Sequence, residues 1–517
     1  MRPTFFYAIS LLCFSFCLQL TAQENRFTKV FYDLAGEGIS ANRSVLTVDE
    51  GILTVGGNLL LKVDSLGSKV WSKSYYSAQS RIEFADVIAL SDTSYVTVGT
   101  LSHLVTNVPT GLIQKVNAVG EIVWSKTLQL GTVPCKIASV EKTFDQNLVV
   151  VGFTAENNSL RSRMVVAKMT SDGDLLWSKL YTGSNTENCA YSIKQKADSS
   201  FVITGELENC NPCTTYAFLL QVSESGQPIW AKKYINTKTN YGRGLDMSIE
   251  PDHIVFLVQE GILQVDGLGT IKRVTSSRAL TFQVAGQKNG YRRRLLKTKD
   301  GGYLIPCGNP FGAALVKTDS DCNIAWLQRL LLVAADVHET QSGQLVVVGN
   351  GPMQGVGVPE NILSPQIGII RTDHKGNGSG CTDLETLFPY EDSIQASAQV
   401  FNVQAVGSLQ PISIQTDSIK IIEINDCVGF QSKRVELQND HLLSVAPNPT
   451  HSKITIQSEP KIDKAMVAIY DLNGRKIRQM DEDQYSGEID LSGLHTGVYL
   501  LRITTDAQVG TVKIVKE

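Results

Sequence analysis

The chain has 517 residues, of which 42% are hydrophobic and 19% charged, and its formal net charge at pH 7 is −4. This length exceeds one ordinary domain, so several units or a repeat array are expected. No basic excess is present to neutralise phosphates, which excludes a nucleic-acid-binding protein of the usual charge type. Glycine (42) outnumbers proline (16), and short alternating runs rich in Val, Ile, Thr and Tyr favour strands and tight turns.

The N-terminus has the pattern of a secretory signal peptide. Arg2 supplies the positive charge, residues 5–20 are almost wholly apolar, and a small-residue cleavage point follows at Ala22. The apolar run is shorter than the ~20 residues that span a bilayer. We therefore expect residues 1–22 to be a signal peptide, and we expect no membrane span in the mature chain.

A repeat organises residues 23–378. Its frame is Asp-x-x-Gly-x-x-x-Trp-Ser-Lys, and in four copies the glycine recurs every 53 residues (120 − 67, 173 − 120, 226 − 173). Weaker copies continue in phase at residues 269, 322 and 376, with spacings of 43, 53 and 54. The repeated residues are Gly67, Gly120, Gly173, Gly226, Trp71, Trp124, Trp177, Trp230 and Trp326, which include every tryptophan of the chain.

Each repeat contains four short alternating runs, a pattern typical of the four-stranded sheets of a β-propeller. In one copy these runs are residues 177–181, 190–194, 201–204 and 218–222. The sequence therefore predicts an all-β fold with a seven-bladed β-propeller over residues 23–378. We expect each unit to open with its Trp strand, and the run at residues 27–31 to open the first unit with Phe in place of Trp.

The repeated tryptophans and glycines have structural explanations. An indole buries ~150–250 Å², so the in-phase tryptophans suit a wedge between blades; a row of exposed rings that stack on sugars or bases is the functional alternative. The Asp-x-x-Gly segment suits a turn with glycine at positive φ, whereas calcium loops would need more carboxylates. The frame resembles the tryptophan-docking motif of quinoprotein-like propellers, although it is one residue shorter between Asp and Gly. This resemblance implies the architecture and no quinone cofactor.

Loop length distinguishes the two faces of the predicted ring. Short, uniform turns such as residues 64–67 lie on one face, and long, dissimilar connections lie on the other. The long connections are residues 101–111, 153–163, 206–216 and 350–366. Variable loops on a rigid scaffold commonly carry binding, so we expect a ligand on the long-loop face. Residues 236–243, with Tyr241 and Arg243, are a candidate patch, and a solvated loop is the structural alternative.

The cysteines and histidines form no complete chemical site. Export would place the eight cysteines outside the signal (10 − 2) in an oxidising compartment. Cys210 and Cys213 have metal or redox spacing, but no second pair or nearby His supports zinc. No nucleophile elbow, phosphate loop or metalloprotease motif occurs in the sequence, so we assign no catalytic residue, metal or cofactor. The candidate disulfides join Cys189 to Cys210 or Cys213, and Cys381 to Cys427.

From residue 442 the pattern changes to a compact β module, predicted to be a small immunoglobulin-like β-sandwich over residues 442–517. Its motifs, in order, resemble the type A C-terminal sorting domain of the type IX (Por) secretion system. The resemblance implies delivery through the periplasm, recognition by the outer-membrane translocon and removal of the domain as the cargo is anchored or released. Residues 379–441 are either a linker or a small β segment. The residues that carry the resemblance are Pro447, Asn448, Pro449, Tyr470, Asp471, Gly474, Arg475, Gly497, Val498 and Tyr499.

The sequence favours a secreted or cell-surface propeller exported by type IX secretion. The leading hypothesis for its role is a binding or adhesion module, without enzymatic activity, for a glycan, peptide or protein. An exported glycan hydrolase or lyase that uses carboxylates on the long-loop face is the second hypothesis, and a periplasmic assembly scaffold is the third. The expected partners are the type IX translocon and an unidentified extracellular ligand.

Overall fold

Strands and turns account for the described residues of the computed structural model, and no helix occurs among them. The N-terminal segment predicted to be a signal peptide lies outside the described residues. Within the described ranges there is accordingly no helix of the length and hydropathy that a membrane span requires. The structure describes residues 26–33, 39–91, 93–154, 162–183, 187–210, 213–237, 242–259, 261–276, 294–309, 312–330, 332–351, 366–377, 382–384, 394–419, 421–425, 444–447, 449–457, 466–471, 476–480, 488–504 and 509–517.

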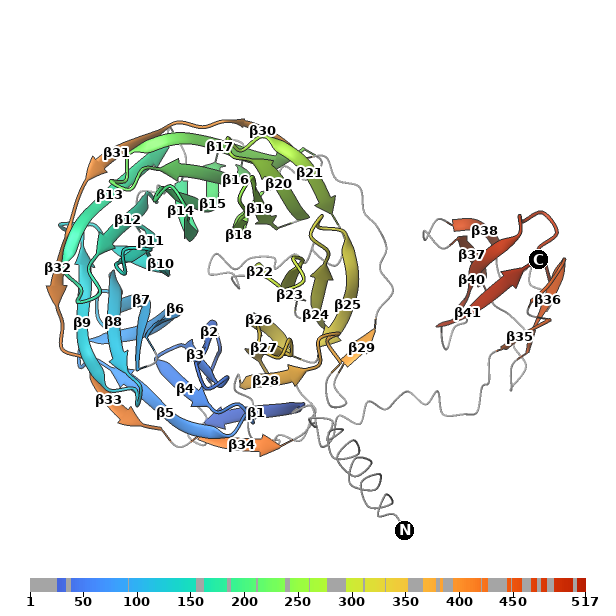
Figure 1. Cartoon of the computed structure of the whole chain (residues 1–517), viewed down its shortest axis with the longest axis horizontal. Coiled ribbons are helices and arrows are strands. Elements are labelled where there is room, and N and C mark those ends of the chain that lie inside the picture. The colour runs from blue at the N-terminus through green and yellow to red at the C-terminus, as the bar shows by residue number, and fades with distance from the viewer. Residues whose placement is uncertain are drawn as a thin grey trace, which may run out of the picture. The chain divides into compact units, whose positions relative to one another are not determined.

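The chain divides into two compact units. The first comprises Met1–Thr275, Ala279–Glu385 and Asp392–Val428, and the second comprises Gly429–Glu517 with the short segments Ser276–Arg278 and Thr386–Glu391. Within the first unit, the described residues form seven antiparallel sheets arranged in a ring (Figure 1). We call these sheets blades 1 to 7. The prediction of an all-β propeller followed by a smaller β module is confirmed.

The strands of the first four blades follow the chain from the inside of the ring outward. Blade 1 has β2 (Arg43–Leu46), β3 (Ile52–Gly56), β4 (Leu59–Val63) and β5 (Lys69–Tyr76); blade 2 has β6 (Ser80–Ser91), β7 (Ser94–His103), β8 (Pro109–Asn117) and β9 (Ile122–Gln129). Blade 3 has β10 (Cys135–Lys142), β11 (Leu148–Thr154), β12 (Met164–Met169) and β13 (Leu175–Gly183); blade 4 has β14 (Glu187–Gln195), β15 (Phe201–Cys210), β16 (Cys213–Val222) and β17 (Pro228–Asn236).

The remaining blades keep this order, except that blade 7 takes its outermost ring strand from the N-terminus. Blade 5 has β18 (Gly244–Ile249), β19 (His253–Val258), β20 (Gly261–Asp266) and β21 (Ile271–Ser276); blade 6 has β22 (Leu296–Lys297), β23 (Tyr303–Asn309), β24 (Gly312–Thr318) and β25 (Ile324–Leu330). Blade 7 has β26 (Val333–Glu339), β27 (Leu345–Asn350), β28 (Ile367–Thr372) and β1 (Phe27–Asp33).

The Trp strand is the outermost of the four ring strands of its blade, so the prediction that it opens a unit is wrong by one strand. Trp177, for example, lies in β13, which pairs with β12 of the same sheet. The N-terminal strand β1 pairs with β28, with Phe27 opposite Arg371, and thereby completes the last blade. The physical reason is that the short Asp-x-x-Gly turn joins two strands as a hairpin, and a repeat period alone does not show where a sheet begins.

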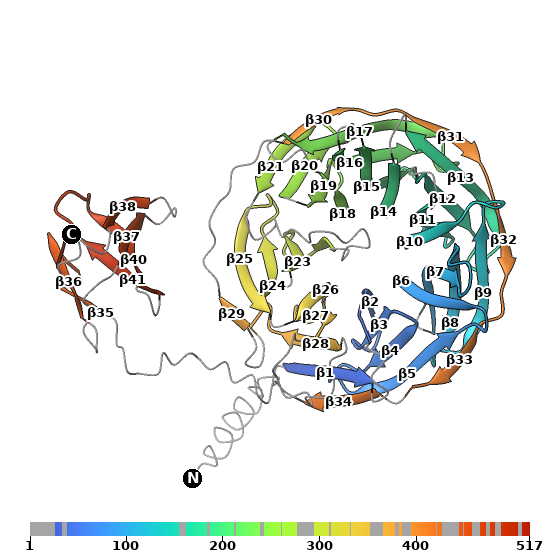
Figure 2. The same cartoon turned by 180° about the vertical axis from the view of Figure 1, so that it is seen from behind.

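A belt of short strands surrounds the ring (Figure 2). It adds a fifth, outer strand to six of the blades and runs in the direction opposite to the chain order of those blades. In the described residues, blade 5 has four strands. The segment predicted as a linker or small β segment thus contributes paired strands to the propeller. The belt strands are β29 (Thr382–Leu384) on blade 6, β30 (Ile394–Ala398) on blade 4, β31 (Phe401–Ala405) on blade 3, β32 (Ser408–Pro411) on blade 2, β33 (Gln415–Ser418) on blade 1 and β34 (Ile421–Asn425) on blade 7.

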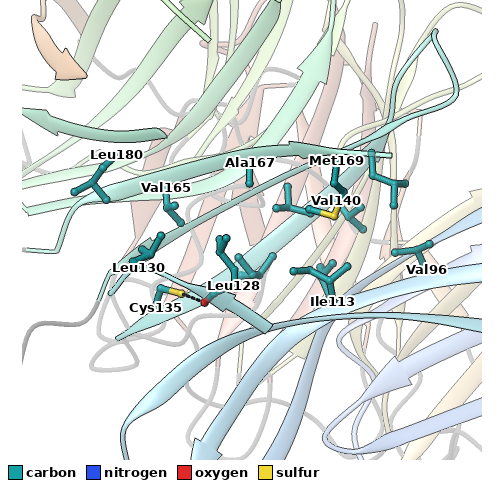
Figure 3. Close-up of a cluster of buried hydrophobic side chains, with 14 residues drawn as sticks. Val96, Ile113, Leu128, Leu130, Cys135, Val140, Val165, Ala167, Met169 and Leu180 are labelled. Atoms are coloured by element: carbon teal, nitrogen blue, oxygen red, sulfur yellow. Dashed lines mark hydrogen bonds between the residues drawn. The ribbon is translucent and has the colours of Figure 1, made fainter. Parts of the chain in front are cut away.

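Apolar side chains fill the spaces between successive blades. Figure 3 shows the cluster between blades 2 and 3, in which Ile113 and Leu128 of one blade pack with Val140 and Val165 of the next. The buried thiol of Cys135 in this cluster donates a hydrogen bond to the Leu128 carbonyl oxygen at 3.3 Å. Because both faces of each sheet are covered in this way, middle strands such as β3, β4 and β12 are buried along their whole length and do not alternate strictly.

The repeated tryptophan, glycine and a tyrosine meet between blades. Gly120 has φ 77° in the turn of blade 2, and a Cβ built on it would lie 2.8 Å from the Trp71 ring of blade 1. Tyr75, four residues after Trp71, donates its hydroxyl to the Gly120 carbonyl oxygen at 2.6 Å. Corresponding hydrogen bonds join Tyr181 to Gly226 and Tyr234 to Gly269, both at 2.7 Å. The indoles are partly buried and pack against the clusters between blades.

The second unit contains two small sheets around one apolar cluster, as the predicted sandwich requires. The cluster includes Ile454 and Ile489 from one sheet and Ile469, Leu501 and Ile514 from the other. The first sheet comprises β35 (Ser444–Ala446), β36 (Lys453–Gln457) and β39 (Glu488–Asp490); the second comprises β38 (Lys476–Met480), β37 (Met466–Asp471), β40 (Gly497–Thr504) and β41 (Val509–Lys516).

Candidate functional site

The first strand of each blade lies nearest the centre of the ring (Figure 1). In five of these inner strands a β-bulge interrupts the pairing with the second strand. The inserted residues are Ala85, Ala138, Tyr191, Leu245 and Ala335. Bulges re-aim side chains and are frequent beside functional sites. Blade 4 therefore differs from the other four, because its bulge carries a large side chain with a hydrogen-bonding end.

Tyr191 is the centre of a polar and aromatic cluster. Its hydroxyl donates to Glu206 Oε1 at 2.5 Å, and Arg243 Nε donates to Glu206 Oε2 at 2.5 Å. The Arg243 guanidinium carbon lies 5.9 Å from the centroid of the Tyr191 ring. The Phe153 ring meets Tyr191 edge to face, with centroids 6.4 Å apart. Blades 3 and 4 and the residue just before β18 of blade 5 thus contribute to one cluster.

The protonation state of this cluster suits recognition more than proton transfer. Burial, together with Cys189 and Glu206, raises the pKa of Tyr191 well above its ordinary value of 10, so the phenol stays protonated and acts as a donor. The Glu206 carboxylate is neutralised by Arg243 in an ion pair whose side chains are 11% and 18% exposed. The arrangement brings an aromatic ring, a hydroxyl and a neutralised ion pair together in one cluster.

Three of the segments named from the sequence meet here. Phe153 begins the connection 153–163, Glu206 begins 206–216, and Arg243 ends the candidate patch 236–243. The structure also corrects the extent of two connections: residues 206–216 are mostly the paired ends of β15 and β16, and 101–111 are mostly the ends of β7 and β8. Tyr241 and most of residues 350–366 lie outside the described residues.

Cys189 is a free, buried thiol, so the predicted bridge from it to Cys210 or Cys213 is not formed. The strand register explains this. Cys189 is paired with Glu206, and Glu206 lies four residues before Cys210 along β15. Four residues of strand span ~13 Å, beyond the ~4.4–6.8 Å between the Cα atoms of a disulfide. Burial raises the pKa of Cys189 to about 12, and its sulfur lies 3.4 Å from Ser162 Oγ.

The other predicted cysteine pairings remain untested. Cys210 and Cys213 are directly opposite each other at the end of the β15–β16 hairpin, but their side chains lie outside the described residues. Cys381 and Cys427 lie outside them as well.

A second set of polar side chains follows the bulges on the inner strands. Asp86, Asp246 and Asp336 occupy the position after the bulge in blades 2, 5 and 7, and all are buried. Each carboxylate accepts a hydrogen bond from a backbone N–H of the next blade. These bonds are Val140 N to Asp86 at 3.1 Å, Leu295 N to Asp246 at 3.0 Å and Ser44 N to Asp336 at 2.9 Å. The aspartates therefore join neighbouring blades near the centre of the ring.

Asp336 lies in a compact charged group. Arg294 Nη1 is 3.2 Å and Arg43 Nη1 is 4.0 Å from its carboxylate, and His338 Nε2 is 2.8 Å from Ser44 Oγ. Burial by itself would raise the pKa of Asp336, but the two arginines and the Ser44 N–H lower it to about 2. Burial lowers the pKa of His338 to about 4, so its imidazole is neutral at pH 7. This group stabilises the junction of blades 6, 7 and 1.

Sequence reasoning missed the bulge residues and the inner-strand aspartates, although a signal for them exists. A second glycine series, Gly99, Gly152 and Gly205, also recurs every 53 residues (152 − 99, 205 − 152). A Cβ built on Gly205 would lie 1.8 Å from the Cys189 carbonyl oxygen, because the bulge of β14 brings backbone against β15. Such a glycine marks the bulge on the facing strand and hence the position of Tyr191.

No group of three or more His, Cys, Asp or Glu side chains in the described parts of the chain is arranged to hold a metal ion.

The residues of the sorting motif lie in the second unit. Pro447 and Pro449 are exposed beside β35, and Tyr499 in β40 donates its hydroxyl to the His495 carbonyl oxygen at 2.9 Å. Tyr470 and Asp471 end β37, and Gly497 and Val498 begin β40. Asn448, Gly474 and Arg475 lie outside the described residues.

Residues 444–517 match the family described as "Secretion system C-terminal sorting domain". The match confirms the resemblance drawn from the sequence motifs. The chain is a substrate of type IX secretion and is exported to the cell surface or released. Export by this route implies an interaction with the secretion machinery. No curated protein matches the chain.

Two solved structures are similar at low identity. A crystal structure of a protein of unknown function from Bacteroides caccae is 12% identical, with a TM-score of 0.37, over 54% of this chain and 92% of that chain. PorZ, described as a surface component of the type-IX secretion system of Porphyromonas gingivalis, is 10% identical, with a TM-score of 0.26, over 92% of this chain and 70% of that chain. TM-scores below 0.5 support no statement about function, so the site is interpreted from its own geometry.

Proposed function

We propose that this exported protein is a propeller that binds an extracellular ligand through its long-loop face, with Tyr191, Glu206 and Arg243 at the contact. The single observation that carries the proposal is the bulge of blade 4, which places a tyrosine where four other blades have Ala or Leu. In the other four blades this position is Ala or Leu, as a purely structural role allows. An aromatic side chain with a hydroxyl in one blade supports a local function in that blade.

The chemistry of the cluster supports binding over catalysis. Glycosidase chemistry needs two carboxyl groups that flank a bond, one of them able to donate a proton. The buried inner-strand aspartates accept hydrogen bonds from neighbouring blades, and Glu206 is paired with Arg243. An aromatic ring beside directional hydrogen-bonding groups, by contrast, suits a glycan or a peptide.

A glycan array and a peptide array, probed beside a turnover screen on the same compounds, test this proposal. For a ligand found in this way, Tyr191→Phe, Glu206→Gln and Arg243→Met should each weaken binding about tenfold, which corresponds to ~1.4 kcal/mol. The control is Asp300→Asn, which removes one carboxylate from the short-turn side of blade 6, where the Asp300 side chain is 65% exposed.

Two outcomes would contradict the proposal. Product formation without stable binding would favour the exported hydrolase or lyase. Unchanged affinity in all three variants would place the ligand elsewhere on the ring.

A further inference from the structure

Exposed apolar side chains gather on the short-turn face, the face that carries the β2–β3 and β4–β5 turns and their counterparts in other blades. Nine large hydrophobic side chains of the described residues lie there, each between 50% and 66% exposed. We call them the apolar arc. They are Val48, Leu66, Val70, Val119, Val123, Phe144, Leu176, Ile229 and Leu268.

The arc follows the repeat and covers one side of the ring. The residue before the repeated tryptophan is Val70, Val123, Leu176 and Ile229 in blades 1 to 4. In blades 5, 6 and 7 the same position holds Lys272, Ala325 and Arg26. Scattered apolar residues on a surface need no explanation. A series at one structural position in consecutive blades is not scattered in this way, and it favours an interaction surface.

Several charged side chains between these apolar residues form ion pairs on the same face. Lys62 lies 3.0 Å from Asp49, and Lys168 lies 2.8 Å from Asp145 and 3.1 Å from Glu224. Lys115 and Lys126 form similar pairs with Asp172 and Asp174 at 3.5 and 3.3 Å. The face therefore carries no strong field of one sign, and a highly charged partner would find no complement on it.

We propose that the apolar arc is the interface of a homodimer, in which two copies stack their short-turn faces about a twofold axis. A twofold interface requires a surface that is complementary to itself. An apolar surface whose charges are paired internally meets this condition, because its copy brings the same apolar area and no net repulsion. In such a dimer both long-loop faces point away from the contact. Each dimer would then present two copies of the proposed ligand site, which increases avidity for a repeated ligand.

Size-exclusion chromatography coupled to light scattering measures the mass of the full-length protein in solution and so tests for the dimer. We expect the wild type to have twice the chain mass at micromolar concentrations, as a standard interface of ~800 Å² per partner allows. The double variant Leu176→Lys/Ile229→Lys should have the mass of one chain. The matched control is Leu104→Lys/Val105→Lys, which adds the same charges at two exposed apolar residues of the β7–β8 connection on the long-loop face. This control should remain dimeric.

A second measurement distinguishes loss of the interface from loss of the fold. Because all four positions are at least half exposed, the substitutions should leave the fold of one chain intact. Both double variants should therefore melt within about 2 °C of the wild type, compared at a dilution at which the wild type is monomeric. A monomeric wild type at 100 micromolar, a dimer that survives the arc substitutions, or a monomer that binds neutral lipid vesicles through the arc would each overturn the proposal.

Discussion

At the scale of residues, one contact between blades explains three positions of the repeat. The Trp177 ring, the turn glycine Gly226 and the Tyr181 hydroxyl come together where blade 3 meets blade 4. Two features favour glycine here: its φ of 75° is one that L side chains rarely adopt, and a Cβ would lie 3.0 Å from the indole. Blade 2 shows that the contact varies, since a Cβ on Gly173 would meet the Lys126 side chain and not an indole.

Removal of this indole should destabilise the ring. Truncating a fully buried Trp costs ~3–5 kcal/mol. Trp177 is only partly buried, so we expect Trp177→Ala to lower the free energy of unfolding by about 3 kcal/mol. Denaturant unfolding of the purified protein measures this value. Leu104→Ala, an exposed apolar residue, is the control and should change it by less than about 0.5 kcal/mol. An unchanged unfolding midpoint in Trp177→Ala would exclude a wedge role for this residue.

The buried imidazole of His338 should make stability depend on pH. Its pKa is lowered from 6.5 to about 4, so above pH 6.5 both the folded and the unfolded chain hold it neutral. As the pH falls from 6.5 to 4, the unfolded state takes up a proton that the folded state resists, and stability is lost. The shift of roughly 2.5 pKa units corresponds to about 3 kcal/mol.

Chemical denaturation of His338→Gln between pH 7 and pH 4 tests this dependence. Gln keeps a polar side chain beside Ser44 and does not titrate, so the variant should lose less stability on acidification than the wild type. His451→Gln is the matched control, because the His451 side chain is 83% exposed. An equal slope in the wild type and in His338→Gln would contradict the assignment.

At the scale of elements, the belt supplies the outermost strand of six blades, so the sheets of the propeller are incomplete without it. Belt strands pair with the outer ring strands at equivalent positions: Lys232 with Ala398, Lys179 with Ala405, Lys126 with Pro411, Lys73 with Ser418 and Lys29 with Asn425. The partners advance by seven or six residues per blade (405 − 398, 411 − 405, 418 − 411, 425 − 418). The last belt strand, β34, covers β1, so the N-terminal strand lies between β28 and β34. An edge strand left uncovered invites pairing with other chains.

Truncations on either side of the belt separate its contribution from that of the sorting domain. A chain that ends at Asp440 retains every belt strand and should unfold cooperatively near the temperature of the ring in the full chain. A chain that ends at Asn377 lacks the belt, and we expect its melting temperature to fall by at least about 10 °C, with more aggregation. Circular dichroism melts and limited proteolysis report the difference. Equal melting temperatures would mean that the belt is dispensable for stability.

The sequence pattern did not predict the belt, and the reason is physical. Its strands are short and rich in Gln, Ser and Asn, and their sheets are completed only by partners hundreds of residues away. Gln410, for instance, pairs with Thr127. Periodicity reports which face of a strand is covered. It does not report which strand lies alongside, so it does not distinguish a linker from a β segment in residues 379–441.

At the scale of the whole molecule, ring and sorting domain are separate compact units. The ring ends with β34 at Asn425, and the first strand of the sorting domain begins at Ser444. The sorting domain has its own apolar cluster, which includes Ile454, Ile489 and Leu501. Export and ligand binding should therefore be separable by mutation.

Removal of residues 441–517 should abolish export without unfolding the ring. We expect the truncated protein to accumulate in the periplasm, because the translocon has no sorting domain to recognise. Cell fractionation and surface labelling measure this. Tyr191→Phe in the full-length chain is the control and should reach the surface normally, since the cluster of blade 4 plays no part in sorting. Normal surface display of the truncated form would instead support the periplasmic scaffold hypothesis.

The amino-acid sequence alone predicted the features that depend on local pattern. The recurrence of Gly120 and Trp124 every 53 residues predicted the repeat, and alternating runs predicted strands. The motifs around Tyr470 and Tyr499 identified the sorting domain. The strands and the sorting motifs depend on residues close together along the chain, and the repeat depends on the same local pattern returning at a fixed spacing.

The folded chain established the features that depend on residues distant in sequence. It placed the Trp strand at the outside of its blade, joined β1 to β28, paired the belt strands β29 to β34 with the outside of six blades, and left Cys189 without a disulfide. It also brought Phe153, Tyr191 and Arg243 together from three blades. The reason is common to all of these: strand partners and inter-blade contacts are selected by the closure of the ring, and a period along one chain is compatible with more than one way of closing it.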